Sequence, residues 1–309
     1  MFKRFSNRHL LIALGVLAGL YLLSFAFGGR KTRTFKETLS LIDTAQVSRL
    51  QIERPGQETV DIIKNGADWQ LRLSSGALVP AEPGTVNRAL DQLSRLVATQ
   101  LVSRRESDWA TYKVDSTGTR VKVFGGETPL LDLMVGRSEF QQTRQTSYVR
   151  LHDEEEVYGV NGFLEMSFNR DRDDWRNRIL LSGNRNEWSM LTRKGAGDSS
   201  LVMVKGLGNE WMLPDSTVLD RTEVNTYLTG LSNLRGSTFA DGQAPSGLPV
   251  YQLQITTTGE PLEVRAFADP AGGYLLGSTQ NPGVFFRDPD SSLTQRVFPP
   301  VARFLPVEE

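Results

Sequence analysis

The sequence contains no cysteine, only two histidines, and no excess of either charge. Its 309 residues include 35 lysines and arginines against 36 acidic residues. Without cysteine the chain cannot form a disulfide framework, a thiolate metal site or a cysteine nucleophile. Phosphate-binding glycine loops and the G-x-S-x-G motif are also absent from the sequence. We therefore expect no metal site and no cofactor, and we assign no catalytic residue.

What the sequence does contain is one long apolar run, at residues 10–27. This run carries no charged residue from Leu10 to Phe27. As a helix it would span about 27 Å, close to the hydrocarbon thickness of about 30 Å. We predict a short basic tail at 1–9, a transmembrane helix at 10–27 in contact with membrane lipid, and a basic juxtamembrane linker at 28–44. A cleaved signal peptide and a buried core helix are the alternatives.

The charges around this run give only a weak indication of orientation. Three basic residues precede it and four follow it, so the positive-inside rule is nearly balanced. A short tail, one span and a large C-terminal body form a common export layout, and we place the body outside the cytoplasm. Residues 1–40 hold seven basic residues and one acid, which leaves 28 basic and 35 acidic residues, net −7, in the rest. Nucleic acid is not an expected partner, because binding it requires a basic face.

The body of the chain contains one pattern twice. Trp69 and Trp211 each follow a turn and an acidic residue and precede x-Leu. Apolar residues then recur with the spacing of an amphipathic helix at 86–96 and again at 224–234. Alternating segments at 120–124 and 251–255, which predict half-buried strands, and turn signals follow in the two copies. We infer a duplication in which Trp69 and Trp211 are core anchors; a chance likeness in strand and helix order is the alternative.

The predicted fold class is α+β. Strands joined by short turns favour antiparallel pairing over a parallel sheet. We expect the N-terminal transmembrane helix to be followed by two duplicated domains, at residues 45–182 and 183–309. Each domain would have a mostly antiparallel sheet, one main amphipathic helix and a short closing helix.

These motifs resemble the DUF4340 family. The resemblance lies in Trp69-Gln70-Leu71, the helix at 86–96, Tyr112-Lys113-Val114, Tyr148-Val149-Arg150 with Val157-Tyr158, and the closing segment Asp174-Trp175-Arg176-Asn177-Arg178. It covers about residues 45–180 well and the second copy more loosely. The resemblance implies a bacterial membrane-anchored protein, often encoded near ABC-type transporter and gliding-motility-like components. The predicted location is thus the bacterial inner membrane, with a single span and the body on the periplasmic side.

Trp175, Arg176 and Arg178 form the candidate partner surface, because tryptophan and arginine are enriched at protein interfaces. The expected function is a non-enzymatic accessory or scaffolding subunit of a membrane complex. Its expected partner is an integral-membrane protein such as an ABC-type permease. Two alternatives stay open: a ligand-binding module, for example for cell-wall glycan, at the junction of the repeats, and a carboxylate-dependent hydrolase.

Overall fold

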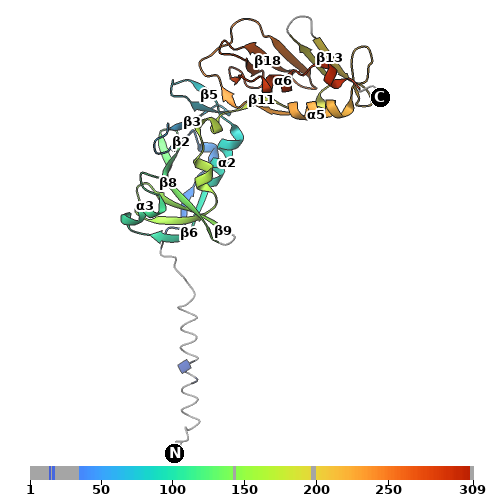
Figure 1. Cartoon of the computed structure of the whole chain (residues 1–309). Coiled ribbons are helices and arrows are strands. Elements are labelled where there is room, and N and C mark those ends of the chain that lie inside the picture. Colours follow the sequence, from blue (N-terminus) through green and yellow to red (C-terminus); the bar gives the residue numbers. More distant parts are fainter. Residues whose placement is uncertain (1–13, 15, 18–34, 142–143, 196–199, 307–309) are drawn as a thin grey trace, which may run out of the picture. The chain divides into compact units, whose positions relative to one another are not determined.

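The computed structural model describes residues 14, 16–17, 35–141, 144–195 and 200–306. The chain divides into two compact units, each assembled from separate stretches. Figure 1 shows the course of the chain and labels its main helices and strands. Unit 1 comprises Met1–Val47, Glu53–Gly56 and Leu90–Asn169, and unit 2 comprises Ser48–Ile52, Gln57–Ala89 and Arg170–Glu309. This division does not test the duplication of domains at 45–182 and 183–309, which remains a prediction.

The described residues of unit 1 form antiparallel strands that are neighbours in the order β1-β6-β10-β9-β8-β7. The strands are β1 (Thr38–Leu41), β6 (Arg95–Ser103), β7 (Thr119–Gly125), β8 (Thr128–Gln141), β9 (Arg144–Leu151) and β10 (Val157–Asn161). Its short helical elements are η1 (Thr44–Gln46), η2 (Glu106–Asp108), α3 (Trp109–Tyr112) and α4 (Leu164–Phe168). Along β7, the buried Val121 and Val123 alternate with Arg120 and Lys122, which is the period of a strand with one face in the core.

The described residues of unit 2 form two antiparallel arrangements and a strand pair. The first has the order β2-β3-β4-β5, the second is an eight-stranded sheet in the order β14-β13-β12-β17-β18-β19-β20-β16, and β11 pairs with β15. The strands are β2 (Arg49–Glu53), β3 (Val60–Asn65), β4 (Asp68–Arg72), β5 (Leu78–Pro80), β11 (Ile179–Ser182), β12 (Met190–Lys194), β13 (Ser200–Lys205), β14 (Trp211–Met212), β15 (Asn233–Arg235), β16 (Thr238–Phe239), β17 (Tyr251–Thr256), β18 (Leu262–Ala268), β19 (Tyr274–Ser278) and β20 (Phe285–Asp288). The helical elements are α5 (Arg221–Leu231), α6 (Ser292–Val297), η3 (Arg172–Trp175), η4 (Arg185–Glu187) and η5 (Val301–Phe304).

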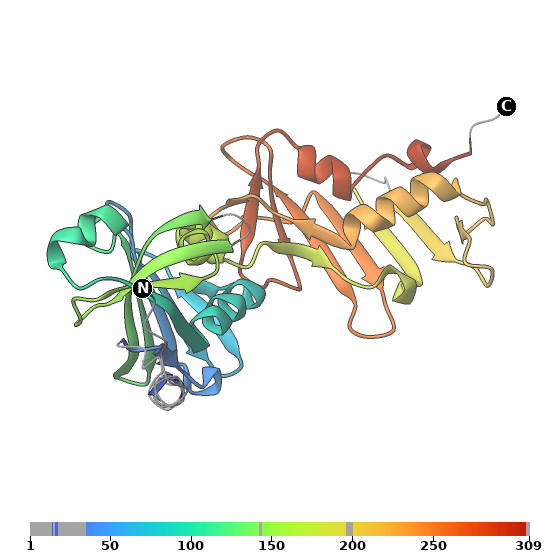
Figure 2. The ribbon, with the colours of Figure 1, turned by 90° about the horizontal axis from the view of Figure 1, so that it is seen from below.

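The core of unit 2 lies between the eight-stranded sheet and the helices α5 and α6, which contact each other (Figure 2). α5 contributes Val224, Leu228 and Leu231 to this core, and α6 contributes Leu293 and Val297. The spacing of three and four residues places the α5 side chains on one stripe of the helix. The burial of that stripe, rather than helix propensity alone, stabilises a helix this short.

The helices α2 (Pro83–Ser94) and α5 form where the sequence predicts amphipathic helices, but both end early. The last leucine of each predicted stripe lies in the strand that follows: Leu96 in β6 and Leu234 in β15. Pro83 suits the first position of α2, because its missing N–H has no helical partner there. Asp220 caps α5, since its Oδ1 accepts a hydrogen bond from Glu223 N at 2.8 Å.

The predicted α+β class with an N-terminal transmembrane helix was wrong. The structure consists mostly of antiparallel β-sheets, with 42% strand against 22% helix. The two amphipathic helices are the strongest periodic signals in the body of the sequence, but short alternating segments occupy more of the chain. Because each helix gives way to a strand earlier than predicted, the balance shifts further towards β-structure.

The predicted membrane location is corrected as well. The span at 10–27, and with it the proposed contact with lipid, lies outside the described residues except for residues 14, 16 and 17. In the part of the chain that the structure describes, no helix combines the length and the apolar character needed to cross a membrane. The structure therefore gives no support to a single-pass protein of the bacterial inner membrane with a periplasmic body.

Candidate functional site

The two tryptophans predicted as core anchors are both buried. Trp69 in β4 is 5% exposed and Trp211 in β14 is 7% exposed. In the antiparallel register Lys64 lies opposite Trp69, and Lys205 lies opposite Trp211. Each indole is thus placed by a short strand whose neighbour presents a lysine at the matching position.

The predicted partner surface lies mostly inside unit 2. Trp175 is fully buried and Arg176 is 2% exposed, so only Arg178 of the three is partly at the surface. Both terminal nitrogens of Arg176 bind the Asp241 carboxylate, at 2.8 and 2.6 Å. The Arg176 guanidinium carbon also lies 3.4 Å from the centre of the Phe239 ring. These contacts hold the Arg176 side chain against Asp241 and Phe239 inside the fold. That the three residues bind a partner remains a prediction.

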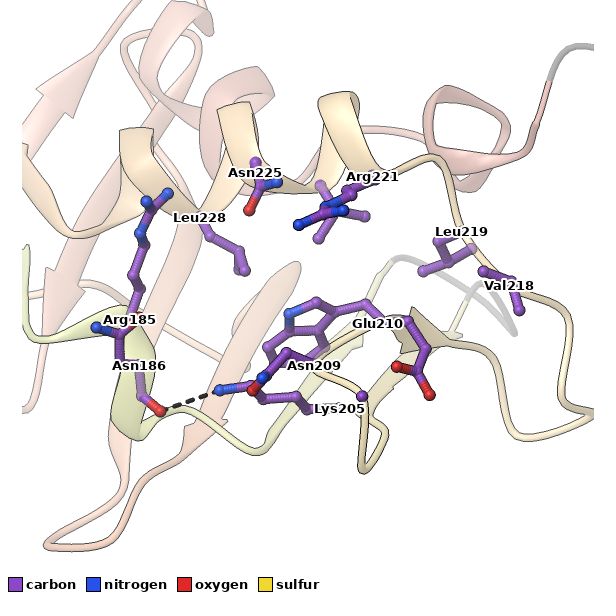
Figure 3. A pocket seen from close by; sticks show the side chains of 13 residues that line it. Arg185, Asn186, Lys205, Asn209, Glu210, Val218, Leu219, Arg221, Asn225 and Leu228 are labelled. Atoms are coloured by element: carbon purple, nitrogen blue, oxygen red, sulfur yellow. Dashed lines mark hydrogen bonds between the residues drawn. The ribbon is translucent and has the colours of Figure 1, made fainter.

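A pocket of about 650 Å³ opens in unit 2 beside Trp211 (Figure 3). Arg221, Asn225 and Leu228 project into it from α5. Lys205, Asn209 and Glu210 belong to the β13–β14 hairpin on the opposite side. The remaining lining residues are Arg185, Asn186, Gly208, Trp211, Val218, Leu219 and Val224.

Among the described residues, three cations and one carboxylate line this pocket. Arg185 Nη1 donates a hydrogen bond to Thr229 Oγ1 at 2.6 Å, and Lys205 Nζ donates to Asn186 O at 3.1 Å. The Arg221 side chain forms no hydrogen bond or ion pair with any residue that the structure describes. Because arginine carries five N–H groups and lysine three, each cation keeps donors that can point at a ligand.

Differences between the two aligned copies, rather than the residues that they share, indicate this pocket in the sequence. When the two helices are aligned with Val224 on Val86, Arg221 takes the place of Pro83. When the two tryptophans are aligned, Asn209 takes the place of Ala67. At these two positions, polar residues that line the pocket replace non-polar ones of the first copy.

A second candidate surface is an apolar patch in unit 1, formed by Phe140, Phe163 and Met166. These side chains are 72%, 47% and 66% exposed. The rings of Phe140 and Phe163 meet edge to face, with their centres 6.2 Å apart. Phe163 precedes α4 and Met166 lies one turn further along, so both share the outer side of this helix.

The apolar patch rests on a well-connected support. Ser138 N in β8 donates a hydrogen bond to Glu165 Oε2 of α4 at 2.6 Å. Leu164 N, at the start of α4, donates to Ser147 Oγ of β9 at 3.1 Å. Tyr148 OH donates to Glu139 Oε2 at 2.6 Å. Burial, reinforced by this hydrogen bond, raises the pKa of Tyr148 to about 12.

The pattern of the segment 163–168 could not show which of its apolar residues face outward. Leu164 and Phe168 are buried four residues apart, whereas Phe163 and Met166 face out. Phe140 has a clearer signal, because it is an aromatic residue within the polar run Ser138-Glu139-Phe140-Gln141-Gln142. Such a local pattern cannot predict that the ring of Phe140 contacts that of Phe163, which lies farther along the chain.

The model of a domain of unknown function, DUF4340, matches residues 69–254, which is more than half of the chain. The chain belongs to the DUF4340 family. The matched region begins at the first tryptophan and extends past the second, so this DUF4340 region contains both tryptophan sites, whereas the resemblance in the sequence lay mainly at 45–180. No curated protein and no solved structure matches the chain significantly.

Proposed function

We propose that this DUF4340 protein is a non-enzymatic accessory subunit that binds a partner protein through the apolar patch of unit 1. The observation that carries the proposal is the edge-to-face contact of two exposed phenylalanines, Phe140 and Phe163, beside the exposed Met166. Single exposed apolar residues are ordinary on a protein surface, but contiguous ones mark interaction sites. Aromatic and methionine side chains are also enriched at interfaces.

The support beneath the patch favours binding without reorganisation. The hydrogen bonds that join α4 to β8 and β9 hold Phe163 and Met166 in place before a partner arrives. A preformed surface avoids part of the entropy cost of ordering side chains on association. Buried aromatic anchors of this kind contribute much of the binding free energy at protein interfaces.

The candidate partner is a permease of an ABC-type transporter, which is the association that the family resemblance implies. An apolar contact of this kind calls for a complementary apolar surface on the permease. We expect the partner to bind at the patch, whose side chains are exposed. Trp175 and Arg176 are buried and cannot offer such a surface.

The test is affinity purification of the tagged full chain from its native cells in a mild detergent, with mass spectrometry of what is retained. We expect an ABC-type permease to be retained by the unmodified chain. The double variant Phe140→Ser and Phe163→Ser should lower its recovery at least about tenfold, because losing one or more anchors costs several kcal/mol of binding.

Leu248→Ser serves as the matched control. Leu248 is 90% exposed in unit 2 and lies outside the patch, so the substitution removes a similar apolar side chain without touching the patch. It should leave recovery unchanged, and thermal unfolding should show that all variants fold alike. Recovery of the unmodified chain alone would refute the accessory role, and full retention of the permease by the double variant would refute the patch as its contact.

A further inference from the structure

The pocket beside Trp211 has the size and the lining of a small-molecule site. We propose that it binds a sugar carrying a carboxylate or a phosphate group. Its volume of about 650 Å³ lies within the range of about 300–1,000 Å³ that small-ligand pockets occupy. All of its lining residues belong to unit 2, and the proposal is independent of the partner that unit 1 binds.

The charges of the lining select an anionic group. Among the described lining residues, Arg185, Lys205 and Arg221 are balanced by Glu210 alone, which leaves an excess of two positive charges. Arg221, whose side chain forms no hydrogen bond or ion pair within the described ranges, projects from α5 into the pocket (Figure 3). A guanidinium forms its strongest hydrogen bonds to carboxylate and phosphate oxygens, which it can hold in a bidentate manner.

The neutral part of the lining selects a sugar rather than a bare anion. A free phosphate needs only donors, whereas sugar hydroxyls both donate and accept hydrogen bonds. Asn209 and Asn225 supply an amide NH₂ group and a carbonyl oxygen each, and they lie on opposite sides of the pocket. Trp211, Leu228 and Val218 add apolar surface against which the C–H faces of a sugar ring can pack.

At the corresponding site in the first copy, the indole of Trp69 has a hydrogen-bond partner within the chain. Trp69 Nε1 donates a hydrogen bond to Asn87 Oδ1 at 3.2 Å. Asn225 occupies the position of Asn87 when the two helices are aligned, but no hydrogen bond joins it to Trp211 in the described chain. Both groups therefore remain available in unit 2, and a ligand can take the place of the contact that the first site makes internally.

Isothermal titration calorimetry on the full chain tests the proposal with four probes: glucose 6-phosphate, galacturonate, glucose and inorganic phosphate. We expect at least one of the two charged sugars to bind with a Kd of about 1 mM or below, the affinity typical of about a dozen well-placed ligand atoms. Glucose and inorganic phosphate should each bind about tenfold or more weakly, since each lacks one half of the recognised chemistry.

Two variants separate the two halves of the site. Arg221→Gln should weaken binding of the charged sugar about tenfold or more and leave weak glucose binding unchanged. Asn225→Ala should weaken sugar binding without changing the affinity for inorganic phosphate. Arg296→Gln is the control, because Arg296 is an exposed arginine on α6 of the same unit and does not line the pocket.

Near-ultraviolet circular dichroism establishes that the variants keep the fold. Absence of binding by both charged sugars up to about 10 mM would overturn the proposal. Equal affinities for phosphate and glucose 6-phosphate would also overturn it, because the pocket would then be a plain anion site. So would a loss of binding in Arg296→Gln as large as that in Arg221→Gln.

Discussion

Trp69 and Trp211 occupy matching places in the chain but have different surroundings. Each lies on a short strand opposite a lysine, Lys64 or Lys205. The carbonyl oxygen of each tryptophan accepts a hydrogen bond of 2.9 Å from a backbone N–H two residues before the following helix. The backbone contacts of the two tryptophans thus match, whereas their side-chain contacts and the length of the following connection differ.

The side chains around the two tryptophans make different contacts. Lys64 Nζ lies 5.7 Å from the centre of the Trp69 ring, and Asn87 accepts the hydrogen bond from the indole N–H. At the second site Lys205 turns to the carbonyl of Asn186, and the pocket lies beside Trp211. The tryptophan of the same motif therefore has an internal hydrogen-bond partner in one copy and lines a pocket in the other.

The connection between tryptophan and helix differs in length. The chain from Trp69 to Pro83 is longer than the chain from Trp211 to Arg221. In the longer connection β5 pairs with β4 through three residue pairs, whereas the described residues of the shorter one form only a single bridge, between Met212 and Val218. Changes of loop length are tolerated because they cost little free energy, and here the shorter loop accompanies the open site.

The largest effect is expected when Trp69→Ala is compared with Trp211→Ala. We expect Trp69→Ala to lower the free energy of unfolding by about 4–5 kcal/mol, and Trp211→Ala by about 3 kcal/mol. The difference reflects the indole hydrogen bond at Trp69, which Trp211 does not form with the described residues. Urea denaturation of the two variants measures it, and an equal or larger loss for Trp211→Ala would mean that the second site is as closed as the first.

A smaller effect should come from the asparagines on the two helices. Asn87→Ala leaves the buried Trp69 N–H without its acceptor, and we expect a loss of about 1–2 kcal/mol. Asn225→Ala should change stability by less than about 0.5 kcal/mol, because its side chain makes no hydrogen bond in the described part of the chain. Denaturation curves decide the point, and a comparable loss in both variants would contradict the assignment of an open site.

The smallest effect concerns the starts of the helices. Asp220→Ala should destabilise by about 1 kcal/mol, because it removes the hydrogen bond to Glu223 N that caps α5. Pro83→Ala in α2 should cost about 0.5 kcal/mol, through the greater freedom of the unfolded chain alone. If thermal unfolding showed Pro83→Ala to be the more harmful change, the two helices would differ in a way that their caps do not explain.

Much of the local structure could be predicted from the sequence. The stripes at 86–96 and 224–234 are helical for most of their length, and the alternating segments at 120–124 and 251–255 lie in β7 and β17. Local periodicity succeeds there because it depends on neighbouring residues only. It fails at the helix ends, where Leu96 and Leu234 continue the apolar spacing but belong to strands.

The candidate sites could be predicted much less well. Trp175 and Arg176 have the composition of a partner surface, yet Arg176 is held by Asp241, which lies far along the chain. Phe140 and Phe163 meet only because β8 and α4 come together in space. Neither contact can be predicted from the spacing of residues along the chain. Composition alone therefore placed the buried Arg176 on the partner surface and did not identify the exposed pair of phenylalanines.

The sequence by itself determined the positions of both main helices and of strands such as β7 and β17, the burial of Trp69 and Trp211, and the family resemblance. These properties follow from short-range patterns of apolar and polar residues. Only the tertiary structure decided which aromatic residues lie at the surface and which tryptophan lies beside a pocket. The physical reason is that exposure and cavities depend on distances between distant segments, and these distances are set when the sheets and helices pack.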